Sequence, residues 1–245
     1  MKKLEILYED DDILLINKPS GMLSIPDRYH PEKPNLLTLL KSQYGEIFTV
    51  HRLDKETSGI LCYARTEAAH KHLSKQFQDR TVEKIYLTLL DGQLHEEEGR
   101  IEKPIAPHPH IEGKMIVTAK GKPSITDWKV VETFKNFTLV EANIKTGRTH
   151  QIRVHFEAIG YPLAVDSVYG RREAFVLSEI KPKKKFRMGK DQEERPLLSR
   201  SILHAFRLTL DHPSSGKRFS QEAPLPKDFR AVVQQLKKWN QVVNG

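Results

Sequence analysis

One nine-residue segment gathers side chains that could carry out chemistry on a substrate. In His51–Gly59 (HRLDKETSG), the carboxylate of Asp54 is flanked by an imidazole, a guanidinium and two hydroxyls. The segment has no regular hydrophobic period and leads into the apolar run 60–64, which predicts a loop feeding a buried strand. Loops at the ends of rigid strands are where reactive groups are commonly placed. Composition alone leaves open a second interpretation, a solvated turn in which Asp54 only caps its own backbone.

A second polar segment is Gly147–His155 (GRTHQIRVH), in which two arginines and two histidines fall within nine residues. Thr149 has the chemistry of a helix N-cap, so Arg153 is expected in the first turns of a helix. Gly147 and Arg148 directly precede that helix, and together with its N-terminal amides they predict a surface that contacts phosphate. The alternative is an amphipathic helix in which Arg153 is merely exposed.

The third segment, Val82–Leu87 (VEKIYL), is typical of a strand. Side chains alternate across a strand, so Lys84, Tyr86 and Thr88 would share one face and the apolar residues between them the other. A tyrosine there could offer a flat stacking surface together with a phenolic oxygen. It could equally be an ordinary half-buried sheet residue.

Strands outnumber helices in the elements that must position these segments. Helical spacing is found in residues 36–44, 67–79, 149–159 and 228–239. Strand patterns are found in residues 4–8, 13–17, 60–64, 82–90, 115–118, 125–131, 137–144 and 202–210. This pattern favours an α+β fold, a large mixed, mostly antiparallel sheet with flanking helices. No linker divides the chain, so a single domain over residues 1–245 is expected.

The composition restricts the partners and the compartment. The net charge of +8 and the pI near 9.4 favour a polyanionic partner, nucleic acid first among them. The chain has no apolar run long enough for a transmembrane helix, and its N-terminus has no signal peptide pattern, so a cytoplasmic protein is expected. Its single cysteine, Cys62, excludes an internal disulfide and a cysteine-rich zinc site, and its apolar setting predicts a buried thiol.

Taken together, the motifs resemble those of RluA-type pseudouridine synthases. The resemblance rests on HRLDKETSG, on EKIYLTLLDG, on GRTHQIRVHFEAIGYPLAVDSVYG, and on the flanking segments LLINKPSGMLSIP and LHAFRLTLDHP. It extends from Leu4 to about Pro226. Few residues precede Leu4, so we expect the form of the family without an N-terminal RNA-binding domain. The family implies the pseudouridine synthase catalytic fold.

The resemblance assigns roles to individual residues. Asp54 occupies the place of the family's nucleophile, and Arg153 that of its ionic partner. Tyr86 corresponds to the active-site tyrosine that stacks on the base and is the favoured group for removing the C5 proton. Arg52 lies where the family places a side chain that enters the stack vacated by a flipped base; contact with phosphate is the alternative.

The remaining expectations concern binding. We place His51, Arg148, Lys183 and Lys184 among the RNA-binding residues, although ordering of the loop is the better role for His51. For the two lysines, which belong to the run Lys183–Lys185, the alternative is a charge run that is merely solvated. The histidine spacings do not match a metal site and the reaction requires no redox step, so no metal and no cofactor are expected. The expected partner is structured ribosomal or transfer RNA, bound by a monomer. The rival functions are an RNA-binding protein of the same fold without catalysis and a hydrolase that cuts the same glycosidic bond.

Overall fold

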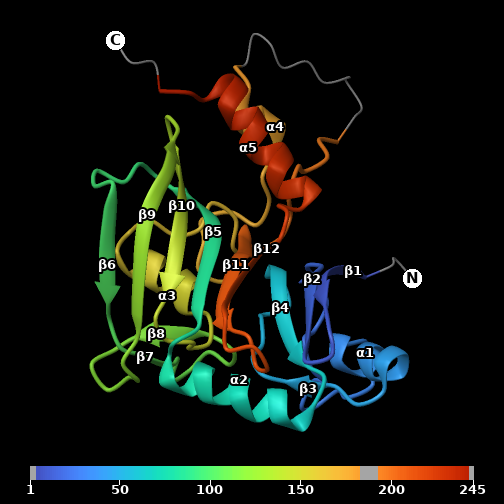
Figure 1. The fold of residues 1–245 in the computed structure, drawn as a ribbon. Helices are drawn as coiled ribbons and strands as arrows, with labels where there is room; N and C mark the ends of the chain where they lie inside the picture. The colour runs from blue at the N-terminus through green and yellow to red at the C-terminus, as the bar shows by residue number, and fades with distance from the viewer. Residues whose placement is uncertain (1–3, 183–192, 243–245) are drawn as a thin grey trace. The chain divides into compact units, whose positions relative to one another are not determined.

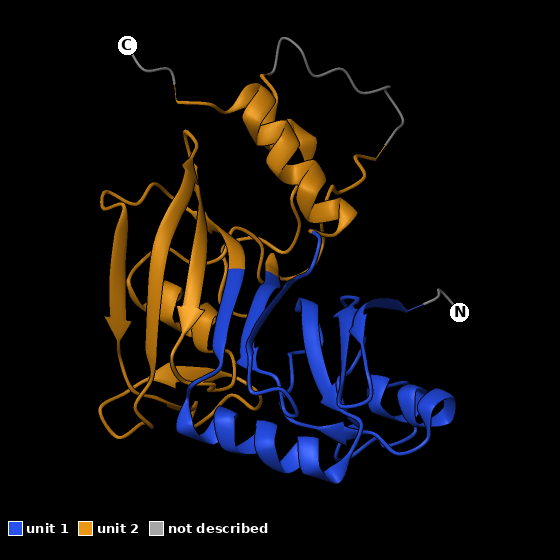
Figure 2. Cartoon of the chain, viewed as in Figure 1, with its two compact units in different colours: residues 1–86, 204–224 blue, residues 87–203, 225–245 orange. Residues whose placement is uncertain are grey.

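The computed structural model describes residues 4–182 and 193–242, which form two compact units. Unit 1 consists of Met1–Tyr86 and His204–Pro224, and unit 2 of Leu87–Leu203 and Leu225–Gly245 (Figure 2). The described residues contain a mixed, mostly antiparallel sheet of ten strands, a sheet of two strands, and five α-helices (Figure 1). This confirms the predicted α+β fold class, whereas the expectation of a single domain stays a prediction.

Unit 1 is built on strands that pair in the order β1-β2-β4-β11-β5, with β3 on β4 and β12 on β11. Their bounds are β1 Glu5–Glu9, β2 Ile13–Lys18, β3 Phe48–Thr49, β4 Ser58–Ala64, β5 Glu83–Asp91, β11 Leu203–Asp211 and β12 Arg218–Glu222. β2 pairs with β4 in antiparallel register, whereas β11 pairs with β4 in parallel through His204↔Ser58 and Ala205↔Gly59. All seven residues of β4 are buried, so the strand after the His51–Gly59 segment is a core element, as predicted.

Two capped helices complete unit 1. Helix α1 (Leu36–Tyr44) begins where the Asn35 side chain accepts a hydrogen bond from the amide of Thr38, and it is followed by Gly45 in a positive-φ conformation. Helix α2 (Glu67–Asp79) is capped in the same way by Thr66 and packs against β4. Both helices have the predicted bounds, because an oxygen-bearing cap precedes an apolar stripe of helical period in each case.

Unit 2 holds the second half of β5 and the strands that follow it in the order β5-β10-β9-β6. The bounds are β6 Glu98–Glu102, β7 Ile105–Pro107, β8 Met115–Val117, β9 Ile125–Thr133, β10 Phe137–Ile144, α3 Gln151–Ala158, α4 Leu177–Ile180 and α5 Lys227–Trp239. β9 and β10 form a long antiparallel pair, seen side by side in Figure 1, and β7 and β8 form the two-stranded sheet.

The predicted start of α3 is wrong. Thr149 is not the N-cap; the helix begins at Gln151 after His150, whose backbone is left-handed (φ 56°) and whose side chain makes no capping hydrogen bond. The Gln151 side chain supplies the local contacts instead, because its Oε1 accepts from the amide of Arg148 at 3.0 Å and from the Thr146 hydroxyl at 2.6 Å. Arg153 nevertheless lies in the first turn, as predicted.

Among the described residues, no helix combines the length and the apolar character that crossing a membrane requires.

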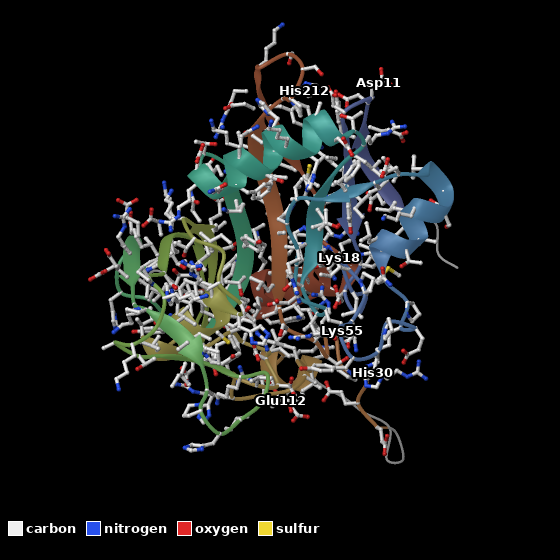
Figure 3. All side chains as sticks on the ribbon, turned by 90° about the horizontal axis from the view of Figure 1, so that it is seen from below. Asp11, Lys18, His30, Lys55, Glu112 and His212 are labelled. Carbon is white, nitrogen blue, oxygen red and sulfur yellow. The ribbon has the colours of Figure 1, made fainter. Side chains whose placement is uncertain are left out.

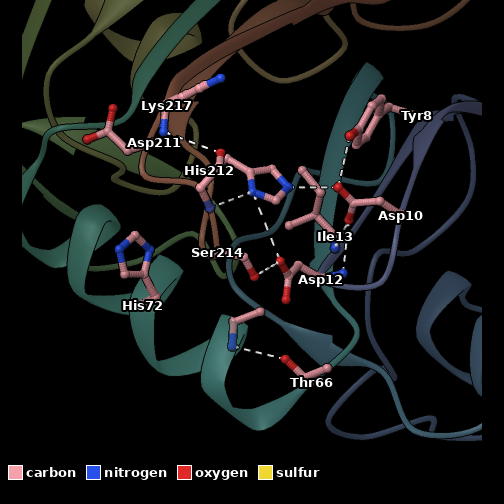
Figure 4. A network of polar contacts seen from close by, with 12 residues as sticks. Tyr8, Asp10, Asp12, Ile13, Thr66, His72, Asp211, His212, Ser214 and Lys217 are labelled. Carbon is pink, nitrogen blue, oxygen red and sulfur yellow. Dashed lines mark hydrogen bonds and ion pairs between the residues drawn. The ribbon is translucent and has the colours of Figure 1, made fainter.

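A polar network joins two turns of unit 1 (Figure 4). Asp10, in the β1–β2 turn, lies 2.7 Å from the His212 ring in the β11–β12 turn and accepts from the Tyr8 hydroxyl at 2.8 Å. Asp12 accepts from the Ser214 hydroxyl. Donor atoms of Asp10, Asp12 and His212 lie within 4.8 Å of one another and could offer ligands to a cation. Since they already hydrogen-bond within the network, we assign them the structural role of joining the two turns.

This network makes unit 1 sensitive to acid. Burial alone would raise the pKa of Asp10, but hydrogen bonds from the Ile13 amide and the Tyr8 hydroxyl outweigh it and lower that pKa below its ordinary value. A lowered carboxyl pKa contributes stability above the unfolded-state pKa of about 3.9, and that contribution is lost as the pH falls through the folded-state pKa. Asp10→Asn should therefore reduce the free energy of unfolding at pH 6, and the difference from the native chain should shrink toward pH 3.

Urea unfolding across that pH range measures the difference, with Asp11→Asn as the matched control. Asp11 lies in the same turn but is exposed, so its replacement should leave the pH dependence unchanged. If the free energy of unfolding of Asp10→Asn differs from that of the native chain by the same amount at pH 6 and at pH 3, the proposed stabilisation by ionised Asp10 is wrong.

Candidate active site

The loop that holds Asp54 is fastened to the turn after β2. The Ser24 hydroxyl donates to the carbonyl of Leu53 at 2.9 Å and accepts from the amide of the same residue at 3.1 Å. The amide of Gly21 donates to the carbonyl of Lys55 at 2.9 Å. Hydrogen bonds therefore fix the backbone on both sides of Asp54, which itself accepts from the amide of Thr57 through its carbonyl. A reactive carboxylate on this loop would be held in position before substrate arrives.

A buried lysine completes this fastening. The side chain of Lys18 is inaccessible to solvent, and its Nζ donates to the carbonyls of Pro19, Met22 and Lys55 at 3.1, 2.7 and 2.9 Å. Burying an ammonium is unfavourable unless acceptors replace its water shell, and three carbonyl oxygens do so here. Figure 3 shows Lys18 and Lys55 in the same part of unit 1. Lys18 therefore ties the turn after β2 directly to the residue that follows Asp54.

Lys18→Met should lower the free energy of unfolding by about 1–3 kcal/mol, because three part-buried carbonyl acceptors lose their donor. Thermal or urea unfolding measures the loss. Lys55→Met is the matched control, since the Lys55 side chain is exposed and only its backbone takes part, and it should change stability by less than about 0.5 kcal/mol. Equal effects of the two replacements would refute the fastening role.

His51 orders the start of the loop. Its Nε2 accepts from the amide of Cys62 at 3.0 Å, and its ring stacks on Phe77 with centroids 4.7 Å apart. Burial, with a smaller contribution from Lys84, lowers the pKa of His51 to about 3, so the ring is neutral at neutral pH. A neutral ring whose Nε2 is engaged by the backbone supports the role of ordering the loop. Contact of His51 with RNA stays a prediction. The Cys62 thiol is buried, as predicted.

The end of the loop is closed by strand β11. Ser58 lies 3.0 Å from Nδ1 of His204, whose Nε2 donates to the carbonyl of Ala223 at 3.1 Å. The next residue, Gly59, has φ +113°, and a Cβ there would collide with the backbone of Ala205. Glycine is therefore required at this position for the close approach of β4 and β11.

Tyr86 lies close enough to Asp54 for the carboxylate charge to act on its phenol. Burial, reinforced by the negative charge of Asp54, raises the pKa of Tyr86 well above its ordinary value. Within unit 1 the structure thus brings together two of the three predicted catalytic residues. A phenol with a raised pKa is neutral at neutral pH and a poor general base. The strand around it is buried on both faces, since Lys84 and Thr88 are buried on the face of Tyr86, and Ile85 and Leu87 on the opposite face.

Arg52, two residues before Asp54 on the loop, is exposed, as a side chain that meets RNA must be. Lys183 and Lys184 lie outside the described residues.

In unit 2, Arg153 forms a buried bidentate ion pair with Asp166, a residue that the sequence motifs did not predict as part of the site. Its Nε and Nη2 donate to the two carboxylate oxygens of Asp166 at 2.5 and 2.8 Å, and the two side chains are 7% and 0% exposed. The guanidinium also lies over the ring of Tyr169, 4.9 Å from its centroid. Burial opposes ionisation of Asp166, but its hydrogen bonds with Arg153 outweigh burial and lower the pKa of Asp166. Asp166 therefore stays charged and fixes the orientation of Arg153.

The surroundings of Asp166 stiffen this pair. Its Oδ1 accepts from the amides of Val168 and Tyr169 at 2.9 and 3.0 Å. The Tyr169 hydroxyl accepts from the amide of Met115 at 2.7 Å and lies 2.9 Å from Nδ1 of His150. One signal for Asp166 was present in the sequence, a carboxylate directly after the apolar run Leu163–Val165. A charge in such a position usually has a partner.

Arg148 lies at the entrance to α3. Its amide is bound by the Gln151 side chain, and its Nε donates to the carbonyl of Pro123 at 3.3 Å. The side chain is half-buried, and its contact with phosphate stays a prediction.

The chain matches the family described as RNA pseudouridylate synthase over residues 12–158, which is more than half of its length. The chain belongs to this family. Its relatives include the ribosomal large subunit pseudouridine synthase D of Nitrosomonas europaea, 40% identical over 239 residues, which cover 96% of this chain and 65% of the relative. The corresponding protein of Neisseria meningitidis is 38% identical, and the match covers 61% of its length. The chain thus spans somewhat less than two thirds of these two relatives.

Another relative identifies the branch of the pseudouridylate synthase family. The dual-specificity RNA pseudouridine synthase RluA of Escherichia coli is 36% identical over 223 residues, which cover 90% of this chain and 93% of the relative. Membership of the RluA type, predicted from the motifs, is confirmed. The structure is also similar to that of human RNA pseudouridylate synthase domain containing 1, with a TM-score of 0.66 and 26% identity over 99% of this chain and 98% of that one. Human RNA pseudouridylate synthase domain containing 4 has a TM-score of 0.70 and 22% identity over 98% of this chain and 95% of that one, and this similarity supports the fold alone.

Proposed function

We propose that this protein isomerises selected uridines in structured RNA to pseudouridine, with Asp54 as the nucleophile. The observation that carries the proposal is the setting of Asp54 within unit 1. The carboxylate lies on a family motif whose backbone is fastened on both sides, and the buried Tyr86 lies close to it. An RNA-binding protein without chemistry would have no need of a carboxylate held in this way. A hydrolase would usually need a second carboxylate to activate water.

The reaction breaks the C1′–N1 glycosidic bond, turns the uracil, and forms a C5–C1′ bond. The C5 proton then leaves and N1 gains a proton, so the product is an isomer and no atom is lost. A covalent adduct on Asp54 would divide this rearrangement into easier steps. Neither an electron carrier nor an activated water enters the balance of atoms.

Tyr86 is proposed as the surface on which the uracil packs. Its raised pKa disfavours the phenolate, which supports the packing role over removal of the C5 proton. Arg52 is proposed to enter the stack that the flipped uridine leaves, since a guanidinium plane stacks well on bases and this side chain is exposed. Arg153 is proposed as the ionic partner of Asp54. Its orientation by Asp166 supports a fixed charge at that position.

The proposed substrate is ribosomal RNA, transfer RNA or both, bound by a monomer in the cytoplasm. The net charge of +8 supports a polyanionic partner. His51, Arg148, Lys183 and Lys184 belong to the proposed RNA contacts.

A pseudouridine map of ribosomal and transfer RNA from cells that lack the protein tests the proposal. We expect one or a few sites to vanish and to return when the native chain is supplied. An unchanged map would refute the synthase, and release of free uracil by the purified protein would favour the hydrolase.

A further inference from the structure

An exposed aromatic ring stands on the loop between β2 and α1. Tyr29 is 75% exposed, whereas the next most exposed large apolar side chain among the described residues, Val131, is 51% exposed. A tyrosine ring in water forgoes the burial that stabilises most aromatic side chains. The fold of unit 1 therefore gains little from this ring, whose surface is open to a binding partner.

The loop holds this ring on a defined backbone. Asp27 accepts from the amides of Tyr29 and His30 through Oδ1 at 2.9 and 3.0 Å, and these bonds lower the pKa of Asp27. The amide of Lys33 donates to the carbonyl of His30 at 3.1 Å. Prolines at positions 26, 31 and 34 restrict the backbone further. A ring presented in this way loses little conformational entropy on binding.

The base of the same loop is fastened to the loop of Asp54. Leu23 and Asn35 form a bridge that closes the loop, and the adjacent Ser24 makes the two hydrogen bonds with Leu53. Tyr29 is five residues beyond Ser24, and an extended chain advances about 3.3–3.6 Å per residue, so the Cα atom of Tyr29 lies within about 18 Å of that of Ser24. In Figure 3, His30 and Lys55 are drawn on the same side of unit 1.

The chemistry of the loop favours a base over a phosphate. The Arg28 guanidinium lies 5.8 Å from the centroid of the Tyr29 ring, so a planar cation and an aromatic face are presented together. The charges of Arg28 and Lys33 are balanced by Asp27 and Glu32, and the Glu32 carboxylate faces His30 at 3.3 Å. A loop without net charge is a poor site for phosphate. Aromatic and guanidinium planes stack on unpaired bases, each base contributing about 1–3 kcal/mol.

We propose that Tyr29, assisted by Arg28, stacks on an unpaired base that flanks the uridine held at Asp54. The inference rests on the proposed function, because it takes RNA as the substrate, and it adds a contact outside the catalytic motifs. The loop would thereby select uridines in loops or bulges, where a neighbouring base is free to stack.

The test uses the full chain and an RNA hairpin whose loop contains one uridine flanked by the fluorescent base 2-aminopurine. We expect Tyr29→Ala to weaken hairpin binding about 10-fold or more. We also expect it to abolish the fluorescence quenching that stacking produces. Tyr29→Phe should bind within about twofold of the native chain, because the ring is kept. The dependence of log Kd on salt should be the same for Tyr29→Ala and the native chain, because stacking releases no counterions.

Val131→Ala, which removes another exposed apolar side chain, is the matched control and should bind as the native chain does. Native-like binding or persistent quenching in Tyr29→Ala would overturn the proposal, as would a native chain that does not bind the hairpin. Pseudouridine formation in cellular RNA is scored separately. A chain that makes pseudouridine but tolerates Tyr29→Ala refutes the stacking contact alone, whereas a chain that makes none refutes the proposed function.

Discussion

Asp54→Asn is expected to reduce pseudouridine formation by at least about 10⁴-fold while leaving the affinity for RNA nearly unchanged. An amide has almost the same size as a carboxylate but is a far weaker nucleophile. The surrounding backbone is held by Ser24 and Lys18 and not by the Asp54 side chain alone, so the loop should keep its shape. The loss should therefore fall on the chemical step and not on binding.

Single-turnover conversion of ribosomal RNA, with Kd measured in parallel, separates the two effects. Glu56→Gln is the matched control, because it neutralises another carboxylate of the same loop and should keep most of the activity. Activity in Asp54→Asn within about 10-fold of the native rate would show that the nucleophile lies elsewhere, since loss of a nucleophile costs far more. Loss of RNA affinity together with activity would point to a role of Asp54 in binding.

Asp166→Ala is expected to lower the free energy of unfolding by about 3–5 kcal/mol, because the buried Arg153 guanidinium loses the carboxylate to which its Nε and Nη2 donate. Asp127→Ala is the control in the same unit. Asp127 pairs with Arg100 at 2.6 Å, but the two side chains are 29% and 58% exposed, so its loss should amount to less than about 1 kcal/mol. Urea unfolding of the three chains measures both values.

The double replacement Arg153→Met with Asp166→Leu distinguishes an unpaired charge from damaged packing. Apolar side chains of similar size often replace a buried ion pair without loss of stability, so the double variant should recover most of what Asp166→Ala loses. Its activity should stay low, because Arg153 is proposed to serve Asp54. A loss of less than about 1 kcal/mol for Asp166→Ala would mean that the pair is solvated in solution.

The sequence predicted best those elements whose signals are local. The bounds of α2 follow from the Thr66 cap and an apolar residue every fourth position, and both features lie within the helix itself. The N-cap of α3 failed because Thr149 has the right chemistry but His150 adopts the left-handed backbone that begins the helix. Strands β6 and β12 were missed because charged side chains of short strands obscure the alternation on which a strand prediction depends.

For the candidate site, the sequence predicted residue types but not their partners. Asp54 and Tyr86 were predicted from motifs, and the structure brings them near each other within unit 1. The burial of Lys18 could not be predicted, because its acceptors include the carbonyl of Lys55, 37 positions away along the chain. His204 bonds to Ser58 across 146 positions. Such pairings follow from strand order, which a local pattern does not determine.

The parallel pairing of β11 with β4 has a consequence for biosynthesis. The end of the loop that holds Asp54 is closed by a strand made 146 positions later, so the ribosome has synthesised most of the chain before that closure is possible. Until then β4 is unpaired at Ser58 and Gly59 on the edge where β3 covers only Tyr63 and Ala64, and an apolar edge strand invites wrong pairing. Pairing β11 with β4 is also slow, because the long stretch of chain between the two strands must lose conformational entropy before their contacts form. Nascent chains of this protein should therefore depend on chaperones until β11 emerges, and the Ser58–Gly59 end of the loop should be among the last parts to become ordered.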